Sequence, residues 1–221
     1  MVHLCIICQE FFRLRTIYQK YLCTSCEDEF NQQRCRSGGL SLRDDLWCIS
    51  LFSYSKTVAS LVVRAKITRD YRALHCLTYM AMWRTETHLM ANWADWVMPA
   101  PSSLTSRMRG SFDIADKLAR QIADECSIKY KCSPPFLGWS RKKRATTDMK
   151  KWDFEGLKKD ADRIRSGVFH KLGSEKHYRW LRSKPKILLI DDVLTSGFTL
   201  SLVTEFLPEA RIRILTIARV D

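Results

Sequence analysis

The sequence predicts an α/β protein built on a parallel β-sheet, with a small cysteine-rich module in front of it. Near the C-terminus, a strand over Lys186–Ile190, a helix over Thr199–Phe206 and a strand over Arg211–Ala218 follow one another closely. A strand, a crossover helix and a second strand at this spacing indicate neighbours in one parallel sheet. The apolar run Ile187–Ile190 fits a central strand that is buried on both faces. Four of the nine cysteines lie within the first 26 residues, which sets that segment apart.

Two domains are expected, with a boundary near residue 40. Residues 1–40 form a zinc-binding module, and residues 41–221 form the domain that contains the sheet. The segment from Met1 to Arg36 has paired cysteines and little hydrophobic periodicity, as expected for a knuckle held by a metal. The glycines in Cys35–Gly39 predict a hinge between the two parts.

Hydrophobic spacing places the first elements of the larger domain. Leu46–Tyr54 alternates enough to predict a strand. Lys56–Lys66 carries apolar residues at helical spacing, and Tyr71–Arg84 continues as an aromatic-rich helical stretch.

A short strand and a long helix are expected in the middle of the chain. Trp93–Met98 predicts a buried strand closed by Pro99. Arg109–Cys126 predicts an amphipathic helix that begins after Gly110, because Ile114, Leu118 and Ile122 stand four residues apart.

Composition and charge restrict the kind of protein and its partners. Hydrophobic residues make up 46% of the 221 residues and aromatic residues 11%, which is ordinary for a globular protein. No apolar run is long enough to span a membrane, and the start lacks a signal peptide, so we expect a cytoplasmic protein. The net charge of +13 favours polyanionic partners such as nucleic acid, phosphorylated metabolites or an anionic membrane face. A basic soluble surface without a specific partner is the alternative.

The first four cysteines have the spacing of a metal site. Cys5, Cys8, Cys23 and Cys26 form two C-x-x-C pairs separated by fourteen residues. Two such pairs can present four thiolates tetrahedrally and leave no position open for water, which predicts a structural zinc ion. A redox C-x-x-C pair or unliganded core thiols are the alternatives. The remaining cysteines show no ligand spacing; they are Cys35, Cys48, Cys76, Cys126 and Cys132.

The strongest chemical signal follows the strand over Ile187–Ile190. Asp191 and Asp192 come next, at the carboxyl end of a parallel strand, where open α/β sheets bind ligands. A turn of small polar residues then enters a helix, and such a turn presents backbone N–H groups to an anion. Carboxylates that accept from ribose hydroxyls beside an amide-rich turn suit a ribose 5′-phosphate. The alternative is a solvated strand end.

These residues carry a resemblance to a known family. Ile187–Thr199 resembles the thirteen-residue phosphoribosyl-pyrophosphate (PRPP) motif of type I phosphoribosyltransferases. The wider layout resembles the ComF (ComFC, GntX-like) family, whose members pair a C-x-x-C zinc module with such a domain and are linked to DNA uptake in natural transformation. Further matching segments are the two C-x-x-C pairs, Tyr54–Lys66, Met98–Pro101, Arg109-Gly110 and Leu215–Arg219. Two departures are the extra residue in Arg109–Asp113 and Phe198 in place of a small residue.

The resemblance implies a fold and a set of site residues. It implies a type I phosphoribosyltransferase-like (Rossmann-like) parallel sheet with helices on both faces over residues 41–221. Asp191 and Asp192 would be the catalytic, ribose-binding acids. Arg109 would lie on the pyrophosphate side of the ligand. An equally supported alternative is that Arg109 belongs to the basic start of a surface helix. The residues expected to surround the 5′-phosphate are Val193, Leu194, Thr195, Ser196, Gly197, Phe198 and Thr199.

The resemblance also implies a function and partners. These are a phosphoribosyl ligand (PRPP with Mg²⁺, or a nucleotide), single-stranded DNA, and a competence helicase or recombination protein. An active phosphoribosyltransferase that transfers phosphoribose to a base or amine is the rival hypothesis, and a regulatory nucleotide sensor is a third.

A basic segment over residues 139–165 has two further interpretations. It joins cationic runs such as Arg141–Arg144 with the aromatic residues Trp139, Trp152 and Phe154. Cations beside aromatic faces suit single-stranded nucleic acid, whereas the resemblance implies a flap over the active site. The alternative to both interpretations is a flexible, solvent-exposed segment.

Overall fold

The computed structural model describes most of the two predicted parts of the chain. The described residues are 2–13, 21–34, 40–43, 46–101, 113–132, 183–195, 197, 200–201, 203–204 and 207–220. The predicted hinge over Cys35–Gly39 and the basic segment 139–165 lie outside these ranges.

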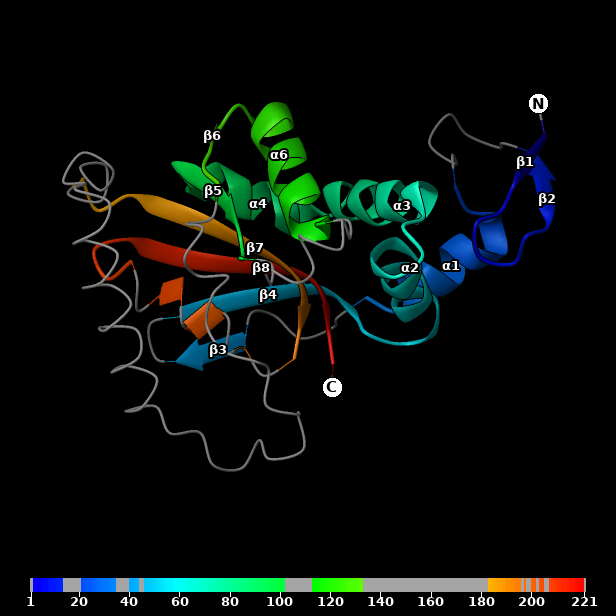
Figure 1. The fold of residues 1–221 in the computed structure, drawn as a ribbon, viewed down its shortest axis with the longest axis horizontal. Coiled ribbons are helices and arrows are strands. Elements are labelled where there is room, and N and C mark those ends of the chain that lie inside the picture. The colour runs from blue at the N-terminus through cyan, green and yellow to red at the C-terminus, as the bar shows by residue number, and fades with distance from the viewer. Residues whose placement is uncertain are drawn as a thin grey trace.

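A six-stranded sheet with the order β3-β4-β8-β7-β5-β6 forms the centre of the molecule (Figure 1). Its strands are β3 (Leu40–Arg43), β4 (Leu46–Ser53), β5 (Trp96–Pro99), β6 (Lys129–Tyr130), β7 (Lys186–Leu194) and β8 (Arg211–Arg219). Strand β3 pairs antiparallel with β4, and the other neighbouring strands of the sheet are parallel. The predicted α/β class with a parallel sheet is therefore confirmed.

Both faces of the sheet are covered, as the apolar run in β7 requires. Leu188 and Ile190 belong to a core cluster shared with the helices α2 (Lys56–Lys66), α3 (Tyr71–Met82) and α6 (Ile114–Cys126). Ile187 and Leu189 belong to a second cluster with Leu200, Val203 and Leu207, in a segment whose described residues 200–201 and 203–204 are helical. Successive residues of a strand face opposite sides, so one apolar run serves both clusters.

Side-chain caps explain where two helices begin. Asp113 caps α6 by accepting from the N–H of Asp116 at 3.0 Å, so the described helix starts at Ile114. Asp70 caps α3 by accepting from the N–H of Arg72 at 2.9 Å. Helix α3 ends at Met82 rather than at the predicted Arg84, and an unpredicted helix, α4 (Thr85–Trp93), follows it. Strand β5 consequently begins three residues later than predicted, at Trp96.

The N-terminal segment packs against the larger domain beside α2 and α3 (Figure 1). It contains the antiparallel pair β1 (Val2–Leu4) and β2 (Phe11–Arg13), followed by the helix α1 (Thr24–Gln32). The Arg72 guanidinium donates to the Leu4 carbonyl at 2.6 Å, and that of Arg64 donates to the Ile6 carbonyl. Periodicity did not predict these elements, because each is short.

In the described part of the chain, no helix combines the length and the apolar character that crossing a membrane requires.

Candidate functional site

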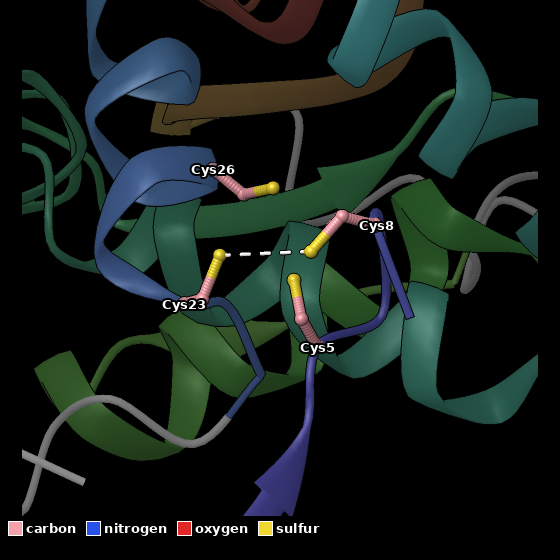
Figure 2. Close-up of side chains that lie close together, drawn as sticks. All are labelled: Cys5, Cys8, Cys23 and Cys26. Carbon is pink, nitrogen blue, oxygen red and sulfur yellow. Dashed lines mark hydrogen bonds between the residues drawn. The ribbon is translucent and has the colours of Figure 1, made fainter. Parts of the chain in front are cut away.

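Four sulfur atoms converge where the β1–β2 turn meets the start of α1 (Figure 2). The Sγ atoms of Cys5, Cys8, Cys23 and Cys26 all lie within 4.8 Å of one another. The Sγ atoms of Cys8 and Cys23 are 3.7 Å apart. The spacing of the two C-x-x-C pairs thus predicted a real cluster.

Local backbone structure holds each pair in place. In the first pair, the N–H of Cys5 donates to the Glu10 carbonyl at 2.9 Å, and the N–H of Gln9 donates to the Cys5 carbonyl at 3.0 Å. In the second pair, Cys23 is the N-cap of α1 and Cys26 lies in its first turn. The positive end of the helix favours thiolates at these positions.

The surroundings of Cys5 favour its thiolate. Burial raises the pKa of this thiol, but hydrogen bonds from the backbone N–H groups of Cys23, Cys8 and Ile7 outweigh burial and bring the pKa down to about 7. Burial, with the neighbouring thiols of Cys23 and Cys5, raises the pKa of Cys26. Four thiolates this close together would repel one another. A metal cation among the four sulfur atoms would offset that repulsion and favour the deprotonated thiols.

The cluster fits a metal ion with four thiolate ligands. Tetrahedral zinc with Zn–S bonds of about 2.3 Å requires sulfur atoms roughly 3.8 Å apart, close to the separation of Cys8 and Cys23. The four cysteines lie close enough to bind a metal ion, consistent with a structural zinc.

The two predicted acids lie inside β7 rather than after it. Asp191 and Asp192 were expected to follow a strand that ends at Ile190, but the strand continues to Leu194. It continues because β8 pairs with it as far as Leu194, opposite Arg219. Both acids remain near the carboxyl ends of the parallel strands, the edge at which such sheets bind ligands.

The two carboxylates have different neighbours. Asp191 stands in register with Thr216 of β8, whose hydroxyl lies 2.7 Å from that of Ser50 in β4. Asp192 forms an ion pair with Lys66 at the end of α2. Each carboxylate also accepts from the next backbone N–H, at 2.9 Å for Asp191 and 2.7 Å for Asp192.

These surroundings favour the protonated form of the Asp191 carboxyl group. Burial, and then the adjacent charge of Asp192, raise the pKa of Asp191 to about 7, although the Asp192 N–H and Lys66 act in the opposite direction. A group that titrates near neutrality at a sheet edge is typical of functional sites.

The segment predicted to bind the phosphate is described only in part. Gly197 is buried and has a φ of 70°, a left-handed conformation that favours glycine. The N–H of Ser201 donates to the Gly197 carbonyl at 2.9 Å, which begins the helical turn that follows. Val193 and Leu194 belong to β7, and Thr195 is exposed beyond it. The other predicted contacts, Arg109, Ser196, Phe198 and Thr199, lie outside the described residues.

Sequence reasoning missed three polar neighbours of the acids. Lys66 is far from Asp192 along the chain, and the strand order that brings α2 to the end of β7 is not encoded locally. Ser50 of β4 and Thr216 of β8 stand opposite each other in the parallel pair. A polar residue near the carboxyl end of a predicted parallel strand was the signal available for both.

No protein-family model and no curated protein matches this chain.

Proposed function

We propose that this chain is a ComF-like protein that binds a phosphoribosyl ligand, PRPP or a nucleotide, at the carboxyl end of β7. The observation that carries the proposal is that Asp191 and Asp192 lie near the carboxyl end of the central parallel strand β7 and that the left-handed Gly197 follows this strand closely. The resemblance to the ComF family supports the wider role, which is to handle single-stranded DNA during uptake in the cytoplasm, with a helicase or recombination protein as partner. The charge of +13 supports a polyanionic partner.

In this proposal each group at the edge has a separate task. Ionised carboxylates at Asp191 and Asp192 accept hydrogen bonds from ribose hydroxyls, and the turn at Gly197 receives the 5′-phosphate. Lys66 neutralises Asp192, so two acids can adjoin an anionic ligand. When PRPP is the ligand, Mg²⁺ accompanies it and offsets the charge of its pyrophosphate.

The raised pKa of Asp191 has a consequence for binding. Near pH 7 part of the population carries a proton on this carboxyl. Hydroxyl donors from the ribose stabilise the ionised form, so ligand binding should release protons at this pH.

The chain is expected to bind PRPP–Mg²⁺ with an affinity that depends on both Asp191 and Asp192. Isothermal calorimetry of the wild-type chain, Asp191→Asn, Asp192→Asn and the double variant should show at least tenfold weaker binding for the double variant. The loss of charge-assisted hydrogen bonds, which contribute about 1.5–3 kcal/mol each, explains this magnitude. Asp124→Asn, an exposed site on α6, is the matched control. Equal affinity in the wild type and the double variant would place the ligand elsewhere.

The alternative function is an active phosphoribosyltransferase. Carboxylates beside the ribose can stabilise the positive charge that develops when pyrophosphate leaves, and the site contains two of them. Release of pyrophosphate from PRPP with a panel of bases and amines separates the two functions: turnover that requires Asp191 favours the enzyme, and no turnover above background favours the binding protein.

A further inference from the structure

The amino-terminal edge of the sheet carries aromatic rings stacked against cations. The Arg213 guanidinium lies 4.3 Å from the ring centroid of Trp93 and 5.6 Å from that of Trp47. On the opposite face of the sheet, the Lys129 ammonium lies 5.2 Å from the ring centroid of Trp96. We call the first group, together with Arg211, the amino-edge surface: Trp47, Trp93, Arg211 and Arg213.

Strand register brings these residues to one end of the sheet. Trp47 of β4 is opposite Arg213 of β8, in the row of Leu188. Trp96 of β5 is opposite Lys129 of β6 in the neighbouring row of Ile187, so this second pair projects from the other face. Arg211 is opposite Lys186 at the start of β7. In Figure 1 this edge lies at the opposite end of the strands from the N-terminal module and α2.

Positive charge dominates the described part of this edge. Lys129, Lys184 and Arg211 are exposed. In the part of the chain that the structure describes, no carboxylate pairs with Lys129 or Arg213. Of the nearby acids, Asp95 uses its carboxylate to accept from the N–H of Lys186 at 2.8 Å, and Glu209 lies in the turn before β8.

The exposure of one indole shows that the surface is accessible. Trp47 is 50% exposed although it stands in a strand next to the core. A guanidinium stacked on aromatic rings keeps its N–H edge available for phosphate oxygens. An exposed indole offers its other face to a base, because every base has a π-face on which to stack.

We propose that the amino-edge surface binds single-stranded DNA, with phosphates on Arg211 and Arg213 and a base on Trp47. The proposal rests on the proposed function for the choice of DNA as the polyanion, and it locates that DNA on described residues. The phosphoribosyl ligand and the DNA would occupy opposite ends of the same strands, so neither would exclude the other.

Fluorescence anisotropy with a fluorescein-labelled strand of about 20 thymidines tests the surface, since single-strand sites of this type cover several nucleotides. Trp47→Ala should weaken binding about 5- to 160-fold, the range found when one stacking aromatic is removed. Arg211→Glu should weaken binding and reduce the slope of log affinity against log salt concentration by about one or more.

Two matched variants control for the loss of any aromatic or any cation. Trp83→Ala removes an indole that is 55% exposed on α3's C-terminal side, and Lys56→Glu reverses an exposed cation at the start of α2. Both should bind the labelled strand like the wild type. Trp47→Phe, which keeps an aromatic face, should restore most of the affinity and guards against a folding defect in Trp47→Ala.

The outcomes separate this inference from the proposed function. If the wild-type chain binds the strand and the amino-edge variants bind it equally well, the surface is wrong while the proposed function stands. If the variants lose the strand but keep PRPP–Mg²⁺ binding by calorimetry, the surface is supported independently of the phosphoribosyl site. Two results would overturn the inference. One is a loss of DNA affinity in Trp83→Ala as large as that in Trp47→Ala. The other is binding of a labelled polyglutamate peptide as tight as that of the labelled DNA strand.

Discussion

The folded protein disfavours the ionised form of the Asp191 carboxyl group. The ordinary pKa of an aspartate is 3.8 here, and burial with the neighbouring Asp192 raises it to about 7 in the folded chain. Between these two values the folded state binds more protons than the unfolded state, so stability falls as the pH rises. The stability that this carboxyl contributes is complete below pH 3.8 and is lost as the pH passes about 7.

Replacing the acid by its neutral isostere should therefore stabilise the chain at alkaline pH. We expect Asp191→Asn to raise Tm by roughly 2–4 °C above pH 8, which corresponds to about 1 kcal/mol in a chain of this size. The gain should shrink as the pH is lowered toward 5. Thermal unfolding followed by circular dichroism over this pH range measures the effect.

Asp192→Asn provides the contrast, because that acid is paired with Lys66 and its removal breaks an ion pair. It should give no stabilisation at alkaline pH. A Tm of Asp191→Asn that follows the wild type at every pH would show that the folded pKa is not raised.

At the scale of elements, α1 is joined to the sheet by an aromatic contact. The rings of Phe30 in α1 and Phe52 in β4 meet edge to face, with centroids 4.5 Å apart, and both side chains are fully buried. Such a pair contributes about 0.5–1.5 kcal/mol beyond the area it buries.

A double-mutant cycle should reveal this coupling. Phe30→Ala and Phe52→Ala should each lower the free energy of unfolding by about 3–5 kcal/mol, and the double variant should lose less than the sum. Urea denaturation measures all four chains, and Phe11→Ala, at a position 78% exposed, controls for the loss of a phenyl group. Strictly additive losses would mean that the two rings do not stabilise each other.

Elements with strong periodicity could be predicted from the sequence. Lys56–Lys66 was predicted with the bounds of α2, because Val58, Leu61 and Val62 recur at helical spacing and are buried. Helix α4 and strand β6 were missed, since β6 has two residues and few residues of α4 are buried. Strand β7 was predicted too short, because its apolar run ends before its backbone pairing does.

The same reasoning explains which parts of the candidate site were predictable. The cysteine cluster was predictable because each pair of ligands is adjacent in sequence and the spacing alone carries the signal. The ion pair between Lys66 and Asp192 was not, because it depends on which strands are neighbours in the sheet. Local patterns specify elements, and strand order needs the whole chain.

At the scale of the whole molecule, the cysteine module and the sheet domain share one hydrophobic core. Cys5, Ile6, Leu22, Cys26 and Phe30 belong to the same cluster of buried residues as the inner faces of α2, α3 and β4. A boundary near residue 40 therefore divides the sequence without dividing the packing. Unfolding of the cysteine module should therefore destabilise the sheet domain against which it packs.

The purified chain should contain one zinc ion, and its removal should lower the stability of the entire protein. Metal analysis should find about one zinc per chain in the wild type and in Cys126→Ser, a cysteine outside the cluster, and none in Cys8→Ser. Structural zinc sites contribute on the order of 10 kcal/mol to small metal-held modules, so a chelator should shift the melting curve to lower temperature. Because the core is shared, the curve should move as one cooperative transition and return when zinc is added back. Two separate transitions, with the chelator acting on the smaller alone, would show that the module unfolds independently of the sheet.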